Sequence, residues 1–293
     1  MTEPTLRAAV VMASAGRPAL LGEVIGDLDR QTIRFAARVV TVPDASSVPD
    51  GLGDDWVVVT GTRGLAAQRN AGIDALSDDI DVVFFFDDDA VVREDYLEEA
   101  LGWFQQHPDA LGLTGRVLLD GATTDEIPRS TADEAIARST GEPHSGRWTP
   151  SRTLYGCNFA YRRSAVPELR FDSRLPLYSW LEDHDFARRL MRHGELAKVE
   201  DCVIVHRGAS SGGRTNHRRL GYSQFMNPVH LRRVGSFPVW LTAWEIFRPT
   251  AKNVVRSVAG SERAWRRERL RGNLMAVGDV LRGRITPERI STL

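Results

Sequence analysis

The chain of 293 residues has few cysteines and lacks a long apolar run. Its two cysteines, Cys157 and Cys202, stand in strand-like apolar surroundings and give no disulfide framework, so we expect a reducing, cytoplasmic location. No run of about 18 apolar residues occurs, and we expect no segment to cross a bilayer. The first residues lack the basic and apolar regions of a signal peptide, and none is expected. A disulfide-stabilised scaffold and an integral membrane protein are therefore excluded.

Two nucleotide-binding motifs are also absent. Neither Gly-x-Gly-x-x-Gly nor a Walker motif occurs, so a dinucleotide-binding or P-loop site has no support. The net charge of −1 conceals an asymmetry, because residues 1–214 hold 23 Lys and Arg against 34 Asp and Glu, whereas residues 215–293 hold 15 against 5. We expect an acidic domain at 1–214 and a basic extension at 215–293. Such an extension suits an anionic partner: a membrane surface, a lipid phosphate or nucleic acid.

The most informative stretch is residues 81–95. Residues 82–86 form an unbroken run of β-branched and aromatic side chains, which favours a strand buried on both faces. Asp87, Asp88 and Asp89 follow at its carboxyl end, where open α/β sheets place their ligands. Side chains alternate along extended backbone, so Asp87 and Asp89 should point one way and Asp88 the other. Two carboxylates on one side suit Mg²⁺ or Mn²⁺, which can hold a diphosphate. The alternative is a solvated acidic turn that caps the next helix.

Strand and helix patterns alternate from the first residues onward. Strands are expected at 6–12, 36–42 and 57–59, with one helix beginning near Pro18 after the first strand and another near Leu65 after the third. This order predicts an α/β fold with a Rossmann-like, mainly parallel central sheet and flanking helices. Further strands are expected at 111–119, 154–161 and 197–205.

A second acidic group lies at the start of a predicted helix. Helical spacing places Asp183 on the buried side, at the amino end, where the helix dipole helps to keep it ionised, and Asp185 on a solvated face. The alternative is that Glu182 and Asp183 only stabilise the first helical turn. His206 follows a strand and could reach the same sheet edge as the triple Asp, although a lone His is more often structural. The small residues 209–214 suit a flap over a ligand.

The basic extension shows two apolar faces at helical spacing. The first consists of Trp240, Trp244, Phe247, Ala251, Val255 and Val258. The second consists of Leu270, Leu274, Val277 and Leu281, with Arg266, Arg267 and Arg271 turned away. We expect two helices that pack on the catalytic domain through these faces. Trp and Phe beside many Arg also fit a helix lying in the plane of a membrane.

With these pieces in place, residues 5–210 resemble family-2 glycosyltransferases of the glycosyltransferase-A fold. The family's motifs occur in its order. They are a first strand ending near Ala13-Ser14, an Asp after the second strand, Gln-Arg-Asn-Ala-Gly in the next helix, an Asp-x-Asp strand end, a Glu-Asp-x-Asp helix start and a late His. Each motif is weak alone, and the ordered set is fairly specific.

The resemblance implies a nucleoside-diphosphate sugar donor, with uridine or deoxythymidine as the base. Ala13 and Ser14 would border the nucleotide, Asp44 would contact the base and Arg69 the nucleotide. Asp88 would contribute to the ribose and metal site.

The resemblance also implies a metal-dependent, inverting transfer of the sugar to an acceptor hydroxyl. Asp87, Asp89 and His206 look like the ligands of Mn²⁺ or Mg²⁺. Asp183 looks like the general base that takes the acceptor proton. An inverting displacement needs only one base on the face opposite the nucleotide.

The acceptor side is less specified. The resemblance implies that Asn158, Trp180 and Glu182 lie near a carbohydrate or lipid-linked acceptor, and that nucleic acid is not a partner. The extension at 215–293 would contact the inner face of a membrane peripherally or form a dimer contact.

Three alternatives stay open from the residues alone. A sugar-phosphate nucleotidyltransferase also uses a Rossmann-like sheet and paired Asp, but Ala13 to Pro18 lacks its Gly-rich basic loop. The residues Asp87 to Val91 also match the signature of haloacid-dehalogenase-type phosphatases, whose nucleophile lies near the amino terminus and whose Lys has few candidates here. A carbohydrate- or lipid-binding module without activity is the third.

Overall fold

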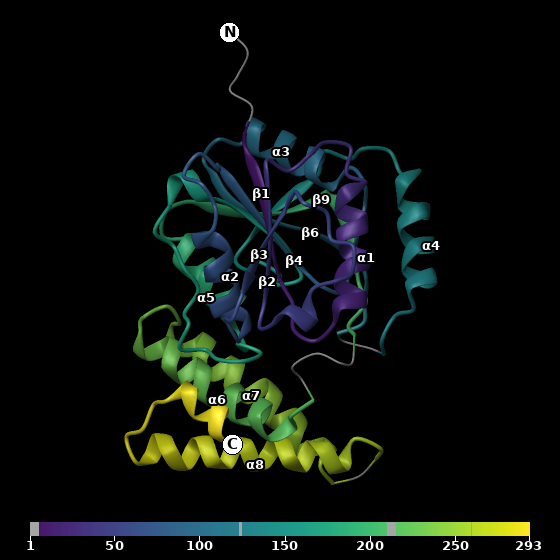
Figure 1. The fold of residues 1–293 in the computed structure, drawn as a ribbon. Coiled ribbons are helices and arrows are strands. Elements are labelled where there is room, and N and C mark those ends of the chain that lie inside the picture. The colour runs from purple at the N-terminus through teal and green to yellow at the C-terminus, as the bar shows by residue number, and fades with distance from the viewer. Residues whose placement is uncertain (1–5, 123–124, 210–214, 259) are drawn as a thin grey trace. The chain divides into compact units, whose positions relative to one another are not determined.

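The computed structural model describes residues 6–122, 125–209, 215–258 and 260–293 (Figure 1). The chain divides into two compact units. The first comprises residues 1–63, 68–170 and 189–210, and the second comprises 64–67, 171–188 and 211–293. The flap predicted at 209–214 lies outside the described residues beyond Ala209, and the domain boundary predicted after residue 214 stays a prediction.

The elements follow in chain order. They are β1 (Ala8–Ala13), α1 (Pro18–Asp29), β2 (Ala37–Val42), η1 (Ala45–Ser47), β3 (Trp56–Thr60), α2 (Leu65–Asp74), β4 (Val82–Asp87), β5 (Ala90–Val92), α3 (Tyr96–Gln106), β6 (Ala110–Asp120), α4 (Arg129–Thr140), β7 (Trp148–Ser151), β8 (Asn158–Arg162), η2 (Arg163–Ala165), α5 (Glu182–Leu190), β9 (Glu195–His206), α6 (His217–Arg233), α7 (Val239–Arg256), α8 (Arg263–Leu281) and η3 (Pro287–Thr292).

The first unit is built on a nine-stranded sheet with the order β3-β2-β1-β4-β8-β6-β9-β5, and β7 pairs with β9. Strands β3, β2, β1 and β4 are parallel, as are β6 and β9, while β8, β5 and β7 pair antiparallel with their neighbours. The sheet is thus parallel from β3 to β4, where strands and helices alternate along the chain as predicted. Beyond β4, parallel and antiparallel pairs are mixed. The predicted α/β class, with a central sheet and flanking helices, is confirmed.

Helices α1 and α3 pack on one face of the sheet, and Figure 1 shows α2 on the other side from α1. Aromatic residues of β4 hold α3 against the sheet. Phe84 and Phe86 both meet the Tyr96 ring edge-on, with centroids 6.4 and 5.1 Å apart. Residues 82–86 of β4 are at most 2% exposed, so the continuous apolar run is covered on both faces, as the sequence predicts.

Helix α2 lies unusually close to β1. A Cβ atom placed on Gly72 would meet Val11 Cγ1 at 2.2 Å, in the buried interior of the unit. Gly72 belongs to the Gln-Arg-Asn-Ala-Gly motif, so the glycine sets how closely this part of the helix approaches the strand. The same approach brings Arg69, which precedes Gly72 in the motif, to Asp87 at the carboxyl end of β4.

Gly72→Ala is therefore expected to lower the free energy of unfolding by up to about 2 kcal/mol. Overpacking a core costs about 1–3 kcal/mol, and the higher helix propensity of alanine offsets about 1 kcal/mol of it. Gly102→Ala in α3 is the matched control, because a Cβ there meets no atom within 4 Å, and we expect it to stabilise the protein. Urea unfolding of the two variants measures both effects. Equal changes in the two variants would contradict the close contact.

The second unit contains α6, α7 and α8. A Cβ on Gly221 of α6 would lie 2.0 Å from the carbonyl oxygen of Arg269, and one on Gly272 of α8 would lie 2.1 Å from that of Arg218. The backbones of α6 and α8 therefore touch at this crossing. Helix α7 joins this pair through Asn253, which is fully buried.

The polar groups of this helical core are paired with one another. Asn253 Nδ2 donates to Gln224 Oε1 and to Asn273 Oδ1, both at 3.0 Å. Arg266 Nη1 donates to Asn253 Oδ1 at 3.0 Å, and Arg266 is 4% exposed. Buried polar groups that are satisfied in this way specify one arrangement of the helices.

The second apolar face predicted for the basic extension is wrong in part. Leu274 and Leu281 are 63% and 83% exposed, while Arg266, which the pattern turned away from that face, is 4% exposed. The close crossing at Gly221 and Gly272 explains the reversal, because it admits only small residues and the polar network beside them. Within the described part of the chain, no helix is long and apolar enough to cross a membrane.

Candidate active site

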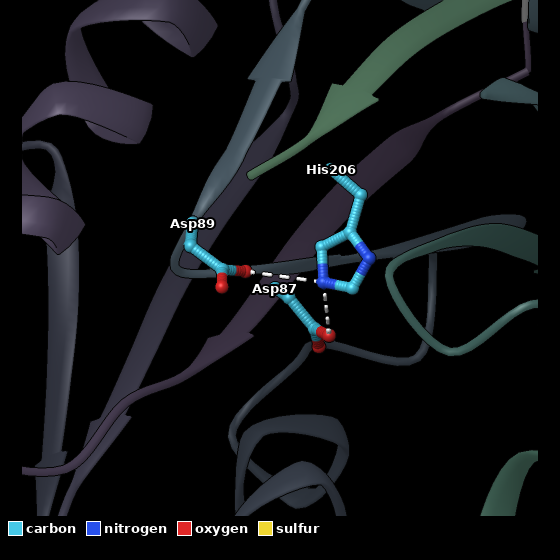
Figure 2. A group of neighbouring side chains, drawn as sticks. All are labelled: Asp87, Asp89 and His206. Carbon is cyan, nitrogen blue, oxygen red and sulfur yellow. Dashed lines mark ion pairs between the residues drawn. The ribbon is translucent and has the colours of Figure 1, made fainter. Parts of the chain in front are cut away.

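Three ligand-type side chains meet at one edge of the sheet in the first unit. Asp87 ends β4, Asp89 lies in the turn to β5, and His206 ends β9, which pairs with β5 so that Ala90 faces His206. His206 Nε2 lies 3.4 Å from Asp89 Oδ1 and 3.8 Å from Asp87 Oδ2 (Figure 2). One ligand atom from each residue lies within 4.8 Å of the others. The structure thus brings together the three residues that the sequence nominated as metal ligands.

This donor set fits a divalent cation. Two carboxylate oxygens and one imidazole nitrogen are ligands that Mn²⁺ accepts, and the imidazole favours it over Mg²⁺. The backbone N–H of Ala209 donates to the second oxygen of Asp89 at 2.7 Å, which leaves Oδ1 facing His206. Asp87 and Asp89 therefore offer their oxygens to the same point.

Asp88 points the other way, as the alternation of side chains predicts. It is 1% exposed, accepts a hydrogen bond of 2.5 Å from Ser14 Oγ and forms an ion pair with Arg17. Ser14 and Arg17 follow β1, so Asp88 ties the first loop of the sheet to the acidic turn. Arg17 also lies 3.9 Å from Asp89. The sequence did not nominate Arg17 as a site residue, although it stands three residues after Ser14.

Charge in the cluster is balanced by neighbouring cations. Burial raises the pKa of Asp87 above its usual value, against the lowering effect of Arg69, whose Nη2 lies 3.1 Å from Asp87 Oδ1. Burial raises the pKa of Asp88 to about 7, although Arg17 and Ser14 favour the ionised form. Burial would likewise raise the pKa of Asp89, but its contacts with His206 lower it. A cation bound between Asp87 and Asp89 would favour the ionised form of Asp87, whose pKa burial raises.

The other residues nominated for the nucleotide surround this edge. Arg69 is 1% exposed and also donates to the carbonyl oxygen of Gly156 at 2.7 Å. Asp44 lies after β2 and accepts hydrogen bonds from Ser46 and Ser47, and these contacts lower its pKa, the Ser46 hydroxyl most of all. Ser47 Oγ in turn accepts from the backbone N–H of Gly16, in the loop after β1.

Asn158 is fully buried, which the sequence did not foresee. Its side-chain oxygen accepts hydrogen bonds from Thr114 Oγ1 at 2.8 Å and from the backbone N–H of Gly115 at 2.9 Å. These bonds join β8 to β6, so Asn158 has a structural role in the sheet. Its contact with an acceptor stays a prediction.

Asp183, Glu182 and Trp180 belong to the second unit, whereas the cluster at Asp87 belongs to the first. Asp183 is half-buried, and its Oδ1 accepts a hydrogen bond from the backbone N–H of His184 at 2.8 Å in the first turn of α5. The convergence of Asp183 with the metal ligands stays a prediction. The orientation expected for Asp185 is wrong, because it is 1% exposed and lies in no solvated face.

The backbone before α5 is strained. Leu177, Ser179 and Leu181 all have positive φ angles, of 60°, 53° and 72°, which side chains other than glycine rarely adopt. The hydroxyl of Ser179 holds this segment by donating to the carbonyl oxygen of Leu175 at 2.6 Å and accepting from the backbone N–H of Ala66 at 3.2 Å. Strain of this kind is concentrated at functional sites. The strained segment contains Trp180 and leads directly into Glu182, the first residue of α5.

Residues 38–170 match the model of a family described as glycosyl transferase family 2. This stretch of the chain is therefore similar to family-2 glycosyltransferases. The resemblance inferred from the ordered motifs is thereby confirmed. A comparison with curated proteins gave no match.

Two solved structures show the same fold as this chain. The mannosyltransferase PcManGT from Pyrobaculum calidifontis, in complex with GDP-Man and Mn²⁺, is 15% identical, with a TM-score of 0.59 over 94% of this chain and 88% of that chain. TarS 1–349 of S. aureus is 13% identical, with a TM-score of 0.58 over 98% of this chain and 83% of that chain. At such identities the likeness shows the fold alone, and that fold is of the glycosyltransferase-A type, as predicted.

One residue of the family-2 domain has a position that the sequence reasoning missed. Asp120 ends β6, and its Oδ1 lies 2.9 Å from His206 Nδ1, while Tyr155 donates its hydroxyl hydrogen to Asp120 Oδ2 at 2.7 Å. The chain segments that follow β6 and β9 touch next to Asp120 and His206, because a Cβ on Gly121 would lie 1.9 Å from the carbonyl oxygen of Arg207. An Asp-Gly pair at a strand end was the available signal.

Asp120 fixes the tautomer and orientation of His206. With Nδ1 bonded to Asp120, the other ring nitrogen, Nε2, faces Asp87 and Asp89. Burial disfavours the charged imidazole, but the interaction with the Cys157 sulfur and hydrogen bonds with Asp120 and Asp89 raise the pKa of His206 above its ordinary value.

Asp120→Asn is expected to weaken Mn²⁺ binding by roughly 10- to 100-fold, as loss of a carboxylate that orients a ligating His does in other metal sites. Calorimetric Mn²⁺ titration in the presence of a nucleoside diphosphate measures the change. Tyr155→Phe, which removes only the hydrogen bond to Asp120, should have a smaller effect in the same direction. Unchanged Mn²⁺ affinity in Asp120→Asn would contradict the orienting role.

A second group of similar composition lies elsewhere in the first unit. Glu99, His144 and Asp201 also bring one ligand atom each within 4.8 Å of the others. Both oxygens of Asp201 already accept hydrogen bonds from Ser145 and Gly146. This group holds the loop at Ser145 and Gly146 against β9.

Proposed function

We propose that the chain is an inverting glycosyltransferase that moves a sugar from a nucleoside-diphosphate donor to an acceptor hydroxyl and depends on a divalent metal. The observation that carries the proposal is the convergence of Asp87, Asp89 and His206 at a sheet edge within and beside a family-2 domain. The complex of PcManGT with GDP-Man and Mn²⁺ supports both a nucleotide-sugar donor and a metal.

In this proposal Asp87, Asp89 and His206 hold Mn²⁺ or Mg²⁺. A cation bound there supplies positive charge against the charge that develops on the leaving diphosphate. Arg17 lies 3.9 Å from Asp89 and Arg69 lies 3.1 Å from Asp87, so both add to the positive field. The donor's nucleotide would lie along the loops after β1 and β2, bordered by Ala13 and Ser14 and reaching Asp44, with Asp88 held in place by Ser14.

Asp183 is proposed as the general base. It takes the proton of the acceptor hydroxyl while that oxygen forms a bond to the anomeric carbon of the sugar. The bond from that carbon to the diphosphate breaks, and its electron pair leaves with the nucleoside diphosphate. The attack comes from the face opposite the leaving group, so the anomeric configuration is inverted.

The acceptor is proposed to be a carbohydrate or a lipid-linked saccharide that meets Trp180 and Glu182. The strained segment 177–181 supports this position, because it fixes the side chains that precede the base. Trp180 offers an aromatic surface, and its carbonyl oxygen is anchored by Asn227 Nδ2 at 2.9 Å.

Thermal unfolding in the presence of UDP-, dTDP- and GDP-sugars, with and without Mn²⁺, tests the donor class. A ligand at about 100 times its Kd stabilises a protein by about 2.7 kcal/mol, so we expect one nucleotide class to raise the Tm by roughly 5–10 °C, and only with Mn²⁺. Release of the nucleoside diphosphate from the same donor should follow. Conversion of a sugar 1-phosphate and a nucleoside triphosphate instead would identify a nucleotidyltransferase and overturn the proposal.

A further inference from the structure

Helix α7 in the second unit carries an exposed apolar stripe. Trp240, Trp244, Phe247 and Val255 follow one another at steps of four, three and eight residues, which places them on one side of the helix, and Val258 follows just beyond its end. Each is exposed, from 52% for Trp244 to 72% for Val255. The sequence predicted this face correctly as a set but expected it to be packed, and the structure leaves it uncovered.

The opposite side of α7 supplies its contacts within the unit. Leu241 packs with Leu231 and Phe237, and Asn253 binds Gln224 and Asn273. The stripe is therefore not needed to hold the three helices together. Large exposed apolar patches on one element are uncommon in monomeric proteins and mark surfaces that bind something.

A row of cations borders the stripe. Arg248 and Lys252 are both exposed and lie four and eight residues after Trp244, on the side of α7 next to it, and Arg256 continues the row away from the stripe. Arg256 also pairs with Glu262 at 2.9 Å. A helix with aromatic side chains on one face and Lys or Arg along its edge has the composition of helices that lie in a membrane interface.

We propose that α7 binds an anionic phospholipid surface, lying in its plane. Trp240, Trp244 and Phe247 enter the boundary between headgroups and acyl chains, and Arg248 and Lys252 contact lipid phosphates. The charge of the chain favours this occupant over a second copy. Residues 215–293 carry 15 Lys and Arg against 5 Asp and Glu, so pairing two such faces would bring like charges together, whereas an anionic surface offsets them.

Vesicle flotation tests the proposal with the full chain and without any activity assay. We expect the protein to float with vesicles of phosphatidylglycerol and phosphatidylcholine in equal parts, and far less with phosphatidylcholine alone. Replacing Trp240, Trp244 and Phe247 together by serine should lower the partition coefficient by roughly two orders of magnitude, because three large apolar anchors are lost. Arg248→Gln with Lys252→Gln should lower it by roughly tenfold or more at low salt.

Val57→Ser with Val58→Ser is the matched control. Both valines are exposed, at 50% and 39%, but belong to β3 of the first unit, so their replacement should leave flotation unchanged. The stripe is exposed, so the triple variant should keep the circular dichroism spectrum and Tm of the parent. Equal flotation of parent and triple variant, or no flotation of the parent, would overturn the proposal. A lipid-free dimer that the triple variant abolishes would show that a second copy covers the stripe.

Discussion

Asp89→Ala is expected to reduce sugar transfer by about three orders of magnitude or more and to weaken Mn²⁺ and donor binding together. The substitution removes one of the two carboxylates that face His206 Nε2 and the acceptor of the Ala209 N–H bond. A metal ion provides several kcal/mol of stabilisation to charge developing in a transition state, and each 1.36 kcal/mol is about tenfold in rate. Initial rates of nucleoside diphosphate release and Mn²⁺ calorimetry measure the two effects.

Glu99→Ala is the matched control for Asp89→Ala. It removes a carboxylate from the other group of two acids and one histidine, with His144 and Asp201. Transfer and donor affinity should stay close to those of the parent. If both variants lost activity equally, the loss could not be assigned to a metal at Asp87, Asp89 and His206.

Asp183→Asn should remove transfer and leave donor binding intact. Asparagine keeps the size of the side chain and its capacity to accept the His184 N–H bond, but it cannot take a proton. General base catalysis contributes about 10²- to 10⁴-fold, so a loss of that size in kcat is expected. Nucleotide and Mn²⁺ affinities, measured by calorimetry, should match the parent, because Asp183 is not in the proposed metal or nucleotide site.

The pair of variants separates the two roles. Asp89→Ala should lose binding and rate together, whereas Asp183→Asn should lose rate alone. Full transfer activity in Asp183→Asn would contradict the assignment of Asp183 as the general base. Asp183 would then only stabilise the first turn of α5.

The central strand and its carboxylates were predictable because their signal is local. An unbroken apolar run predicted β4, and the alternation of side chains correctly separated Asp88 from Asp87 and Asp89. His206 was nominated because it follows a strand-like run, and the pairing of β9 with β5 brings it to the same edge.

Asp120 could not be found in this way. Its partner His206 is 86 residues further along the chain, and they meet because β6 and β9 run in parallel with shifts in register. Register between distant strands is a tertiary property, which no local pattern carries. An Asp-Gly pair at a strand end was a signal too common to single out.

The helices of the second unit show a different limit. Hydrophobic periodicity placed Leu274 and Leu281 inside, yet α8 turns Gly272 and Asn273 inward. Contact between the backbones of α6 and α8, together with a buried polar network, outweighed the burial of the leucines. Periodicity identifies an apolar face without saying what covers it, and the same holds for the exposed stripe of α7.

The most direct test of the proposed metal site is anomalous diffraction at the manganese edge from crystals grown with Mn²⁺ and a nucleoside diphosphate. We expect an anomalous peak bounded by Asp87 Oδ, Asp89 Oδ and His206 Nε2, with the diphosphate against it. A peak only at Glu99, His144 and Asp201, or nucleotide bound with no metal at His206, would contradict the proposed metal centre.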